Sequence, residues 1–225
     1  MKRCVIIPAY NEEQTIPLVI RDVRGYCPDI IVIDDGSTDF TGSMARDGGA
    51  RVLSHPKNMG YFEALKTGYR YASEMKYDGI VQIDADGQHN AQYIPALLDK
   101  GRSWDAVIGS RFLGPERYPM PAVKSVGVRI FRHLIHRETG LSITDPTSGF
   151  RFYNRRTFSF ISRLKCTYPD ANLIIMLHRQ GTTIREIPVT MRPNAQGKSM
   201  HRGKTIKYVR EVFKSITQEM NRCRI

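Results

Sequence analysis

The alternation of short apolar runs with helical patterns constrains the fold of this chain more than any other feature of its sequence. Between the runs, apolar residues recur every three to four positions, which is typical of amphipathic helices. Strands that alternate with helices indicate a parallel sheet covered by helices. The sequence therefore predicts an α/β fold with a mostly parallel central sheet, whose first strands cover residues 4–8, 29–33, 50–54, 79–83 and 106–109.

The remaining elements follow the same pattern less regularly. A helix is predicted over residues 122–138 and a strand over 150–153. Residues 183–191 alternate as in an edge strand, a location that tolerates Pro188. Near the N-terminus, Asn11 is predicted to be the N-cap of the first helix.

Polar loops follow three of the predicted strands, at residues 9–12, 34–37 and 84–86. Ligands of parallel sheets bind beyond the carboxyl ends of the strands, so these loops are expected to share one edge of the sheet. Asp84 and Asp86 repel each other unless a positive charge lies between them. Because Mg²⁺ and Mn²⁺ prefer oxygen ligands, the pair predicts a divalent-cation site.

Two readings remain open for several neighbours of this pair. Gln88 can supply a further oxygen to a cation, whereas His89 fits a loop or capping position, since no second His accompanies it. Asp34 and Asp35 either close a turn or accept hydrogen bonds from a nucleoside.

Charge is distributed unevenly along the chain, whose net charge is +12. Residues 1–100 hold 11 Lys and Arg against 14 Asp and Glu (−3), and residues 101–225 hold 23 against 8 (+15). The basic second half indicates an anionic partner: nucleic acid, a phosphorylated substrate or an anionic membrane surface. Because no nucleic-acid-binding pattern is present, we expect no nucleic-acid partner.

Cysteine usage and hydropathy indicate the setting. The four cysteines are scattered without a CxxC pair, which argues against a zinc site or a disulfide framework. No apolar run approaches the roughly 20 residues that cross a bilayer, and the N-terminus lacks the pattern of a signal peptide. Residues 206–216 have a helical period and form an amphipathic, basic C-terminal helix, which either packs on its own domain or docks on an anionic membrane.

Taken in order, the polar motifs carry a family resemblance. Residues 6–13 (IIPAYNEE), 32–39 (VIDDGSTD) and 84–89 (DADGQH) resemble the successive signatures of inverting family 2 glycosyltransferases with the GT-A fold. Within that family the chain most resembles dolichyl- and polyprenyl-phosphate sugar synthases. The resemblance spans about residues 3–210, with further matching stretches at 57–60, 109–112, 145–151 and 197–199.

The resemblance implies a metal-dependent enzyme that moves a sugar from a UDP- or GDP-sugar to a polyprenyl phosphate. An alternative is transfer to a soluble or growing glycan in polysaccharide or cell-wall biosynthesis. The implied cofactor is Mg²⁺ or Mn²⁺, held by Asp84, Asp86 and Gln88. The implied donor-nucleotide residues are Pro8, Tyr10, Glu12, Asp34, Asp35, Lys57 and Asp84.

The resemblance also implies where the acceptor binds. Asp145 opens a loop near the acceptor, as a base or an orienting carboxylate, although a turn carboxylate before Pro146 is the alternative. The implied catalytic residues are thus Asp86, Asp145 and Arg111. The cationic residues implied to hold the acceptor phosphate are Arg111, Lys124, Arg129, Arg192 and Lys198.

Location and domain organisation follow from the same resemblance. Many lipid-phosphate members carry transmembrane helices, for which a small membrane-protein partner would substitute here. We expect a cytoplasmic enzyme that is peripherally associated with the inner face of the membrane. A single GT-A domain over residues 1–225 is predicted, with a nucleotide-sugar and metal half (1–110), an acceptor half (111–200) and the basic C-terminal helix (201–225).

Overall fold

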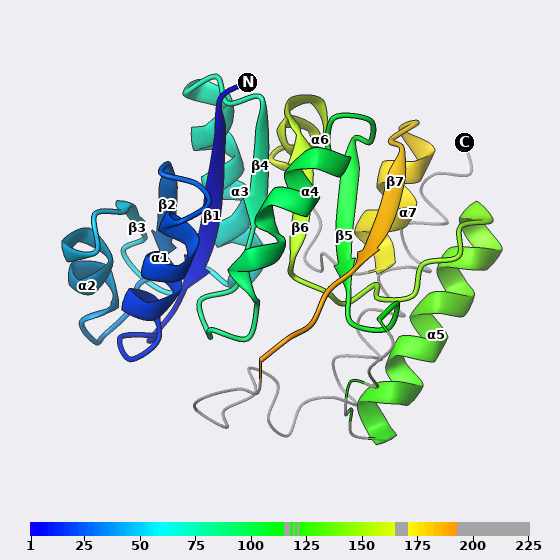
Figure 1. Cartoon of the computed structure of the whole chain (residues 1–225), viewed down its shortest axis with the longest axis horizontal. Coiled ribbons are helices and arrows are strands. Elements are labelled where there is room, and N and C mark those ends of the chain that lie inside the picture. The colour runs from blue at the N-terminus through cyan, green and yellow to red at the C-terminus, as the bar shows by residue number, and fades with distance from the viewer. Residues whose placement is uncertain (115–117, 119, 121, 165–170, 193–225) are drawn as a thin grey trace.

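A central sheet with helices on both faces organises the chain, as the computed structural model in Figure 1 shows. The structure describes residues 1–114, 118, 120, 122–164 and 171–192. Lys198 and the predicted C-terminal helix over residues 201–225 lie outside these residues.

Seven strands form the sheet in the order β3–β2–β1–β4–β6–β5–β7. They are β1 (Arg3–Ala9), β2 (Ile30–Asp34), β3 (Arg51–Ser54), β4 (Gly79–Gln82), β5 (Ala106–Ser110), β6 (Arg151–Asn154) and β7 (Ile184–Pro188). Neighbouring strands are parallel, except that β6 is antiparallel to both β4 and β5. The predicted mostly parallel sheet is confirmed, and the strand that contains Pro188 lies at its edge, as expected.

Helices cover the two faces of the sheet unequally. One face packs against α1 (Ile16–Arg24), α2 (Thr41–Asp47) and α4 (Ile94–Lys100), the last preceded by a 3₁₀ turn (Ala91–Tyr93). The other face packs against α3 (Tyr61–Glu74), α5 (Ala122–Thr139), α6 (Arg155–Ile161) and α7 (Ala171–Arg179).

The central strands are apolar throughout because both of their faces are buried. In β1, Val5 and Ile7 join the core on the α1 side, whereas Ile6 joins the core on the α3 side. In β2, Val32 and Ile31 divide in the same way. Successive side chains of a strand point to opposite faces, so a doubly covered strand is a continuous apolar run.

The start of the first helix differs from the prediction. Thr15, not Asn11, is the N-cap of α1, and proline occupies the first turn. Asn11 adopts a left-handed φ of 55°, which asparagine tolerates better than most residues. Its side chain instead accepts a hydrogen bond from the Thr38 amide, so residues 10–15 form a loop beyond β1.

Candidate active site

The loops that follow β1 and β2 are joined at the carboxyl edge of the sheet. The Asn11 amide N–H donates to Ser37 Oγ over 3.0 Å, and the Thr38 amide donates to Asn11 Oδ1 over 2.8 Å. The Glu12 amide donates to Thr41 Oγ1 over 2.7 Å. Because β4 lies on the other side of β1, the loop after β4 starts at the same edge. The predicted shared edge of polar loops is confirmed.

The two aspartates at the end of β2 organise the loops around them. Asp34 Oδ1 accepts an amide N–H from its own turn over 3.0 Å. Asp35 is only 3% exposed and accepts hydrogen bonds from His55 Nδ1 at 2.7 Å and from the Met59 and Gly60 amides, both at 2.9 Å. These bonds anchor the loop after β3. A direct contact between Asp35 and a nucleotide stays a prediction, and it would compete with them.

Three other predicted donor residues lie at or near this edge. Tyr10 is 45% exposed just beyond the end of β1, whereas Pro8 is buried within the strand. The Lys57 backbone packs against Gly36, where φ is +70° and an added Cβ would collide with it. The structure therefore brings the Lys57 loop directly onto the turn that follows β2.

Asp84 and Asp86 lie in the loop after β4 in different surroundings. Asp84 Oδ1 accepts a hydrogen bond from the Tyr61 hydroxyl over 2.8 Å, and its amide donates to His89 Nδ1 over 2.9 Å. Asp86 Oδ1 accepts the Gln88 amide N–H over 3.0 Å. His89 therefore caps the loop, as predicted.

Repulsion between carboxylates marks this edge as a site for positive charge. Burial, and then the charge of Asp84, raise the pKa of Asp86. Burial also raises the pKa of Glu12, against a hydrogen bond from Thr15, and the charges of Asp86, Asp39 and Asp84 add to the rise. Carboxylates that disfavour one another's ionisation gain from a cation that binds between them.

The residues present fit a divalent cation that is shared with a substrate. Among the described residues, no group of three or more His, Cys, Asp or Glu side chains is placed to hold a metal. Asp84 and Asp86 supply a pair of carboxylates. Such a pair suits Mg²⁺ or Mn²⁺ when phosphate oxygens and water complete the coordination shell. The side-chain role of Gln88 in such a site stays a prediction.

Gly149 brings the predicted acceptor loop against this pair. A Cβ added at Gly149 would lie 2.5 Å from Asp84 Oδ2, closer than real contacts allow. Glycine is thus required for the loop to approach the carboxylate. The loop of residues 145–149 and the loop after β4 meet at this contact.

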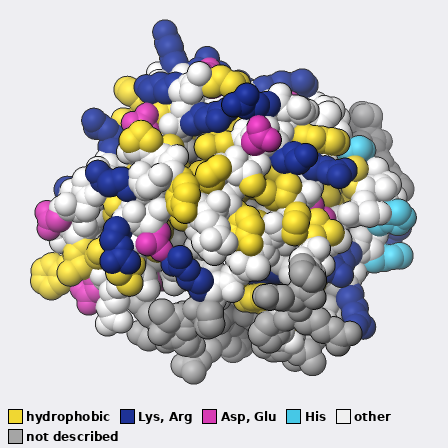
Figure 2. Space-filling model, viewed as in Figure 1, with side chains coloured by type: hydrophobic (Ala, Val, Ile, Leu, Met, Phe, Trp, Pro, Cys, Tyr) yellow, Lys and Arg dark blue, Asp and Glu magenta, His cyan; other side chains and the backbone are white. Residues whose placement is uncertain are grey.

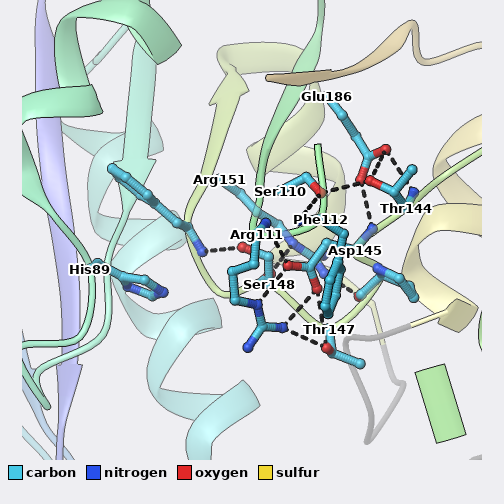
Figure 3. Close-up of polar contacts among 12 residues, drawn as sticks. His89, Ser110, Arg111, Phe112, Thr144, Asp145, Thr147, Ser148, Arg151 and Glu186 are labelled. Carbon is cyan, nitrogen blue, oxygen red and sulfur yellow. Dashed lines mark hydrogen bonds and ion pairs between the residues drawn. The ribbon is translucent and has the colours of Figure 1, made fainter. Parts of the chain in front are cut away.

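Arg111 and Asp145 form a buried, two-pronged ion pair (Figure 3). Arg111 Nε donates to Asp145 Oδ2 over 2.6 Å, and Nη2 donates to Oδ1 over 2.7 Å and to Thr147 Oγ1 over 2.9 Å. Burial alone would lower the pKa of Arg111, but the bonds to Asp145 raise it above its ordinary value. Both oxygens of Asp145 contact Arg111, which favours an orienting carboxylate over a base. Asp145 also opens a turn, because its carbonyl accepts the Ser148 amide over 3.3 Å.

Glu186 of β7 fixes the Thr144–Asp145 turn from the other side, as Figure 3 shows. Its Oε2 accepts the Thr144 amide over 2.7 Å and the Thr144 hydroxyl over 2.9 Å, and its Oε1 accepts the Asp145 amide over 2.8 Å. From α5, Arg132 Nε donates to the Thr144 carbonyl over 2.6 Å. β7 and α5 thereby set the position of the Arg111 partner.

The other predicted acceptor residues do not all join this cluster. Arg129 is exposed on α5, and the Lys124 side chain is not among the described groups. The Arg192 guanidinium pairs with Asp22 of α1 at 2.6 Å, and its amide donates to the Gln88 carbonyl. The chain after β7 therefore crosses to the loop after β4, and the role of Arg192 toward an acceptor phosphate stays a prediction.

Three site residues are absent from the residues selected by sequence: Tyr61, Arg132 and Glu186. Tyr61 and Arg132 lie on predicted helices, where their polar groups do not stand out from the pattern. Glu186 could have been selected from the sequence, because it interrupts the apolar positions of a predicted strand. A charged side chain at such a position needs a hydrogen-bond or ion-pair partner.

Comparisons with known proteins agree with this geometry. Residues 4–161 match the family model described as Glycosyl transferase family 2. The chain is 32% identical over 222 residues to an undecaprenyl-phosphate mannosyltransferase of Micrococcus luteus, covering 90% of this chain and 88% of that protein. It is 30% identical to a polyprenol monophosphomannose synthase of Mycolicibacterium smegmatis, covering 90% and 82%.

Among solved structures, a glucosyl-3-phosphoglycerate synthase of Mycobacterium tuberculosis shares the fold. It was solved with Mn²⁺, UDP-glucose and phosphoglyceric acid. The TM-score is 0.71 at 24% identity, and the match covers 95% of this chain and 79% of that one. At this identity the likeness shows the fold alone.

Proposed function

The chain belongs to glycosyl transferase family 2, and from this premise we propose that it moves a sugar from a nucleotide sugar to a polyprenyl phosphate, with inversion, using Mg²⁺ or Mn²⁺. It is a glycosyltransferase with the GT-A fold. The carboxylate pair Asp84–Asp86 carries the proposal, because it lies at the edge where the loops after β1 and β2 meet.

On the donor side, this chain's residues bind and orient the nucleotide sugar. Asp84 and Asp86 would hold the cation, which offsets the negative charge on the departing nucleoside diphosphate. Tyr10 and the loop that Asp35 anchors lie nearby to contact the nucleoside. A UDP- or a GDP-sugar satisfies this arrangement.

On the acceptor side, positive charge matters more than a base. A phosphate oxygen is already ionised at neutral pH, so positioning by cations replaces proton removal as the main requirement. The Arg111 guanidinium, held in place by Asp145, would grip the acceptor phosphate. The relatives named for undecaprenyl phosphate and polyprenol support a lipid acceptor.

Such an acceptor places the reaction at a membrane surface. Among the described helices, none is long and apolar enough to cross a bilayer. α5 exposes an apolar and basic face, and Figure 2 shows His side chains gathered at the edge of the molecule where this helix lies. We propose peripheral binding of that face to an anionic membrane; it consists of Val126, Arg129, His133, His136 and Arg137.

A panel of UDP- and GDP-sugars incubated with undecaprenyl phosphate tests the proposal, with mass spectrometry of the lipid product. Turnover should require Mg²⁺ or Mn²⁺, stop with a chelator and fall by about a hundredfold or more in Asp86→Ala. Asp99→Ala, which changes an exposed carboxylate on α4, is the matched control. Product on water-soluble glycans and never on the lipid phosphate would favour the glycan alternative, and full activity of Asp86→Ala would refute the metal site.

A further inference from the structure

A buried chain of hydrogen bonds runs from the interior to Asp84. The Tyr69 hydroxyl lies 2.5 Å from Gln82 Oε1, Gln82 Nε2 lies 2.8 Å from the Tyr61 hydroxyl, and that hydroxyl lies 2.8 Å from Asp84 Oδ1. Tyr69 is 1% exposed and Gln82 is 4% exposed. Two turns of α3 and the end of β4 are thus linked directly to the carboxylate pair.

The chemistry of these groups gives the chain one direction. An amide NH₂ only donates, so the Tyr61 oxygen accepts from Gln82 and its single proton points at Asp84. The Tyr69 proton in turn points at Gln82 Oε1. Each pair then shares one proton, and Asp84 Oδ1 is the acceptor at the end of the chain of hydrogen bonds.

His89 supports Asp84 from its other side. Because His89 Nδ1 accepts the Asp84 amide N–H, a neutral ring carries its proton on Nε2, which lies 3.7 Å from Asp84 Oδ2. The ring is 7% exposed and stacks on Phe150 with a centroid distance of 5.2 Å. Packed supports on both sides leave Asp84 little freedom to rotate.

We propose that Tyr61 is a positioning residue that holds Asp84 as an oriented ligand for a divalent cation bound with a nucleoside diphosphate. This inference rests on the proposed function, because it requires a cation at Asp84 and Asp86. Outer groups that hydrogen-bond to a metal ligand typically change metal affinity by about 10- to 100-fold when they are removed.

The variant Tyr61→Phe removes the proton donor and keeps the ring. We expect the affinity for Mn²⁺, measured by electron paramagnetic resonance of free Mn²⁺ with UDP or GDP present, to fall by about tenfold. Added Mn²⁺ should restore most of the turnover. Tyr71→Phe is the matched control, because Tyr71 lies on the same helix and its hydroxyl has no hydrogen bond within the described part of the chain.

The variant Gln82→Met distinguishes the positioning of Asp84 from the stability of the fold. It breaks the buried chain but leaves the Tyr61 hydroxyl to donate to Asp84, so thermal stability should fall while Mn²⁺ affinity stays within about threefold of the wild type. Equal Mn²⁺ affinity of Tyr61→Phe and wild type would overturn the proposal, as would an equal loss in Gln82→Met and Tyr61→Phe. Absence of Mn²⁺ binding by the wild type would overturn the proposed metal site and this inference together, whereas Mn²⁺ binding without transfer to lipid phosphate would refute only the acceptor.

Discussion

At the scale of single residues, a compensated buried charge shapes the proposed acceptor side of the site. The Asp145 side chain is 0% exposed and that of Arg111 is 14% exposed. Such a pair is costly to break, because the remaining partner keeps a charge that neither water nor a counter-ion balances. The pair therefore supplies an arginine whose position is settled before any substrate binds.

We expect Asp145→Asn to destabilise the fold by about 3 kcal/mol and to abolish most activity, because Arg111 loses its counter-charge. The double variant Arg111→Met with Asp145→Asn removes both charges and should recover much of the stability, but none of the activity. Urea unfolding and turnover with undecaprenyl phosphate measure the two effects. An active double variant would show that Arg111 does not contact the acceptor.

The sequence predicted the site residues that lie directly after strands, but not the residues that hold them in position. Asp84 and Asp86 follow an apolar run, so their shared edge could be inferred from strand periodicity alone. Tyr61 contacts Asp84, which lies 23 positions away in the sequence. Glu186 contacts Thr144 and Asp145, which lie 42 and 41 positions away. Only the folded chain brings these residues together. Local periodicity carries no information on such partners.

At the scale of elements, Asp105 joins three strands just before β5 begins. Its Oδ2 accepts the Thr183 amide and hydroxyl, both at 2.8 Å, and its Oδ1 accepts Asn154 Nδ2 at 2.5 Å. These bonds tie β7 and β6 to β5, the strand that leads to Arg111. Burial alone would raise the pKa of Asp105, but the hydrogen bonds from Thr183 and Asn154 lower it below its ordinary 3.8.

Because the pKa of Asp105 is lower in the folded than in the unfolded chain, its carboxylate stabilises the fold above about pH 4, and this contribution is lost as the pH falls through the folded value. Asp105→Asn should therefore cost about 1 kcal/mol at neutral pH, with a smaller difference from wild type in acid. Urea unfolding across this pH range measures it. Asp99→Asn, at an exposed ion pair, is the control and should change the free energy of unfolding little. A destabilisation by Asp105→Asn that stays constant with pH would contradict the proposed role of the Asp105 carboxylate.

The positions of the strands were predictable from the sequence, whereas strand direction and helix starts were less so. Strands β1, β2 and β4 appear as apolar runs, and each lies within one residue of its predicted limits at both ends. The antiparallel direction of β6 depends on how the chain returns to the sheet, which periodicity does not encode. The N-cap of α1 was misplaced because a left-handed residue and a proline in the first turn delay the helix.

At the scale of the whole molecule, the uneven charge along the chain corresponds to two functions that we assign to the two ends of the sheet. The carboxylates that would bind a cation follow β4 in the first half of the chain, whereas Arg111 and α5 belong to the basic second half. In Figure 1, α5 lies at the outer edge of the molecule beyond β7. A lipid phosphate that approaches from a membrane would meet this basic helix before the donor loops.

Charge reversal on α5 tests that approach. The full chain should bind vesicles that contain anionic lipid more tightly than neutral vesicles, and added salt should weaken the binding. Since each basic residue near such a surface contributes about 1 kcal/mol, Arg129→Glu with Arg137→Glu should weaken vesicle binding by about tenfold or more in a sedimentation assay. Arg21→Glu with Arg102→Glu changes two exposed arginines away from α5 and alters the net charge equally, so it is the matched control and should bind as the wild type does. Unchanged binding of the α5 variant would place the membrane contact elsewhere, whereas equal weakening by both variants would show attraction to net charge without a defined docking face.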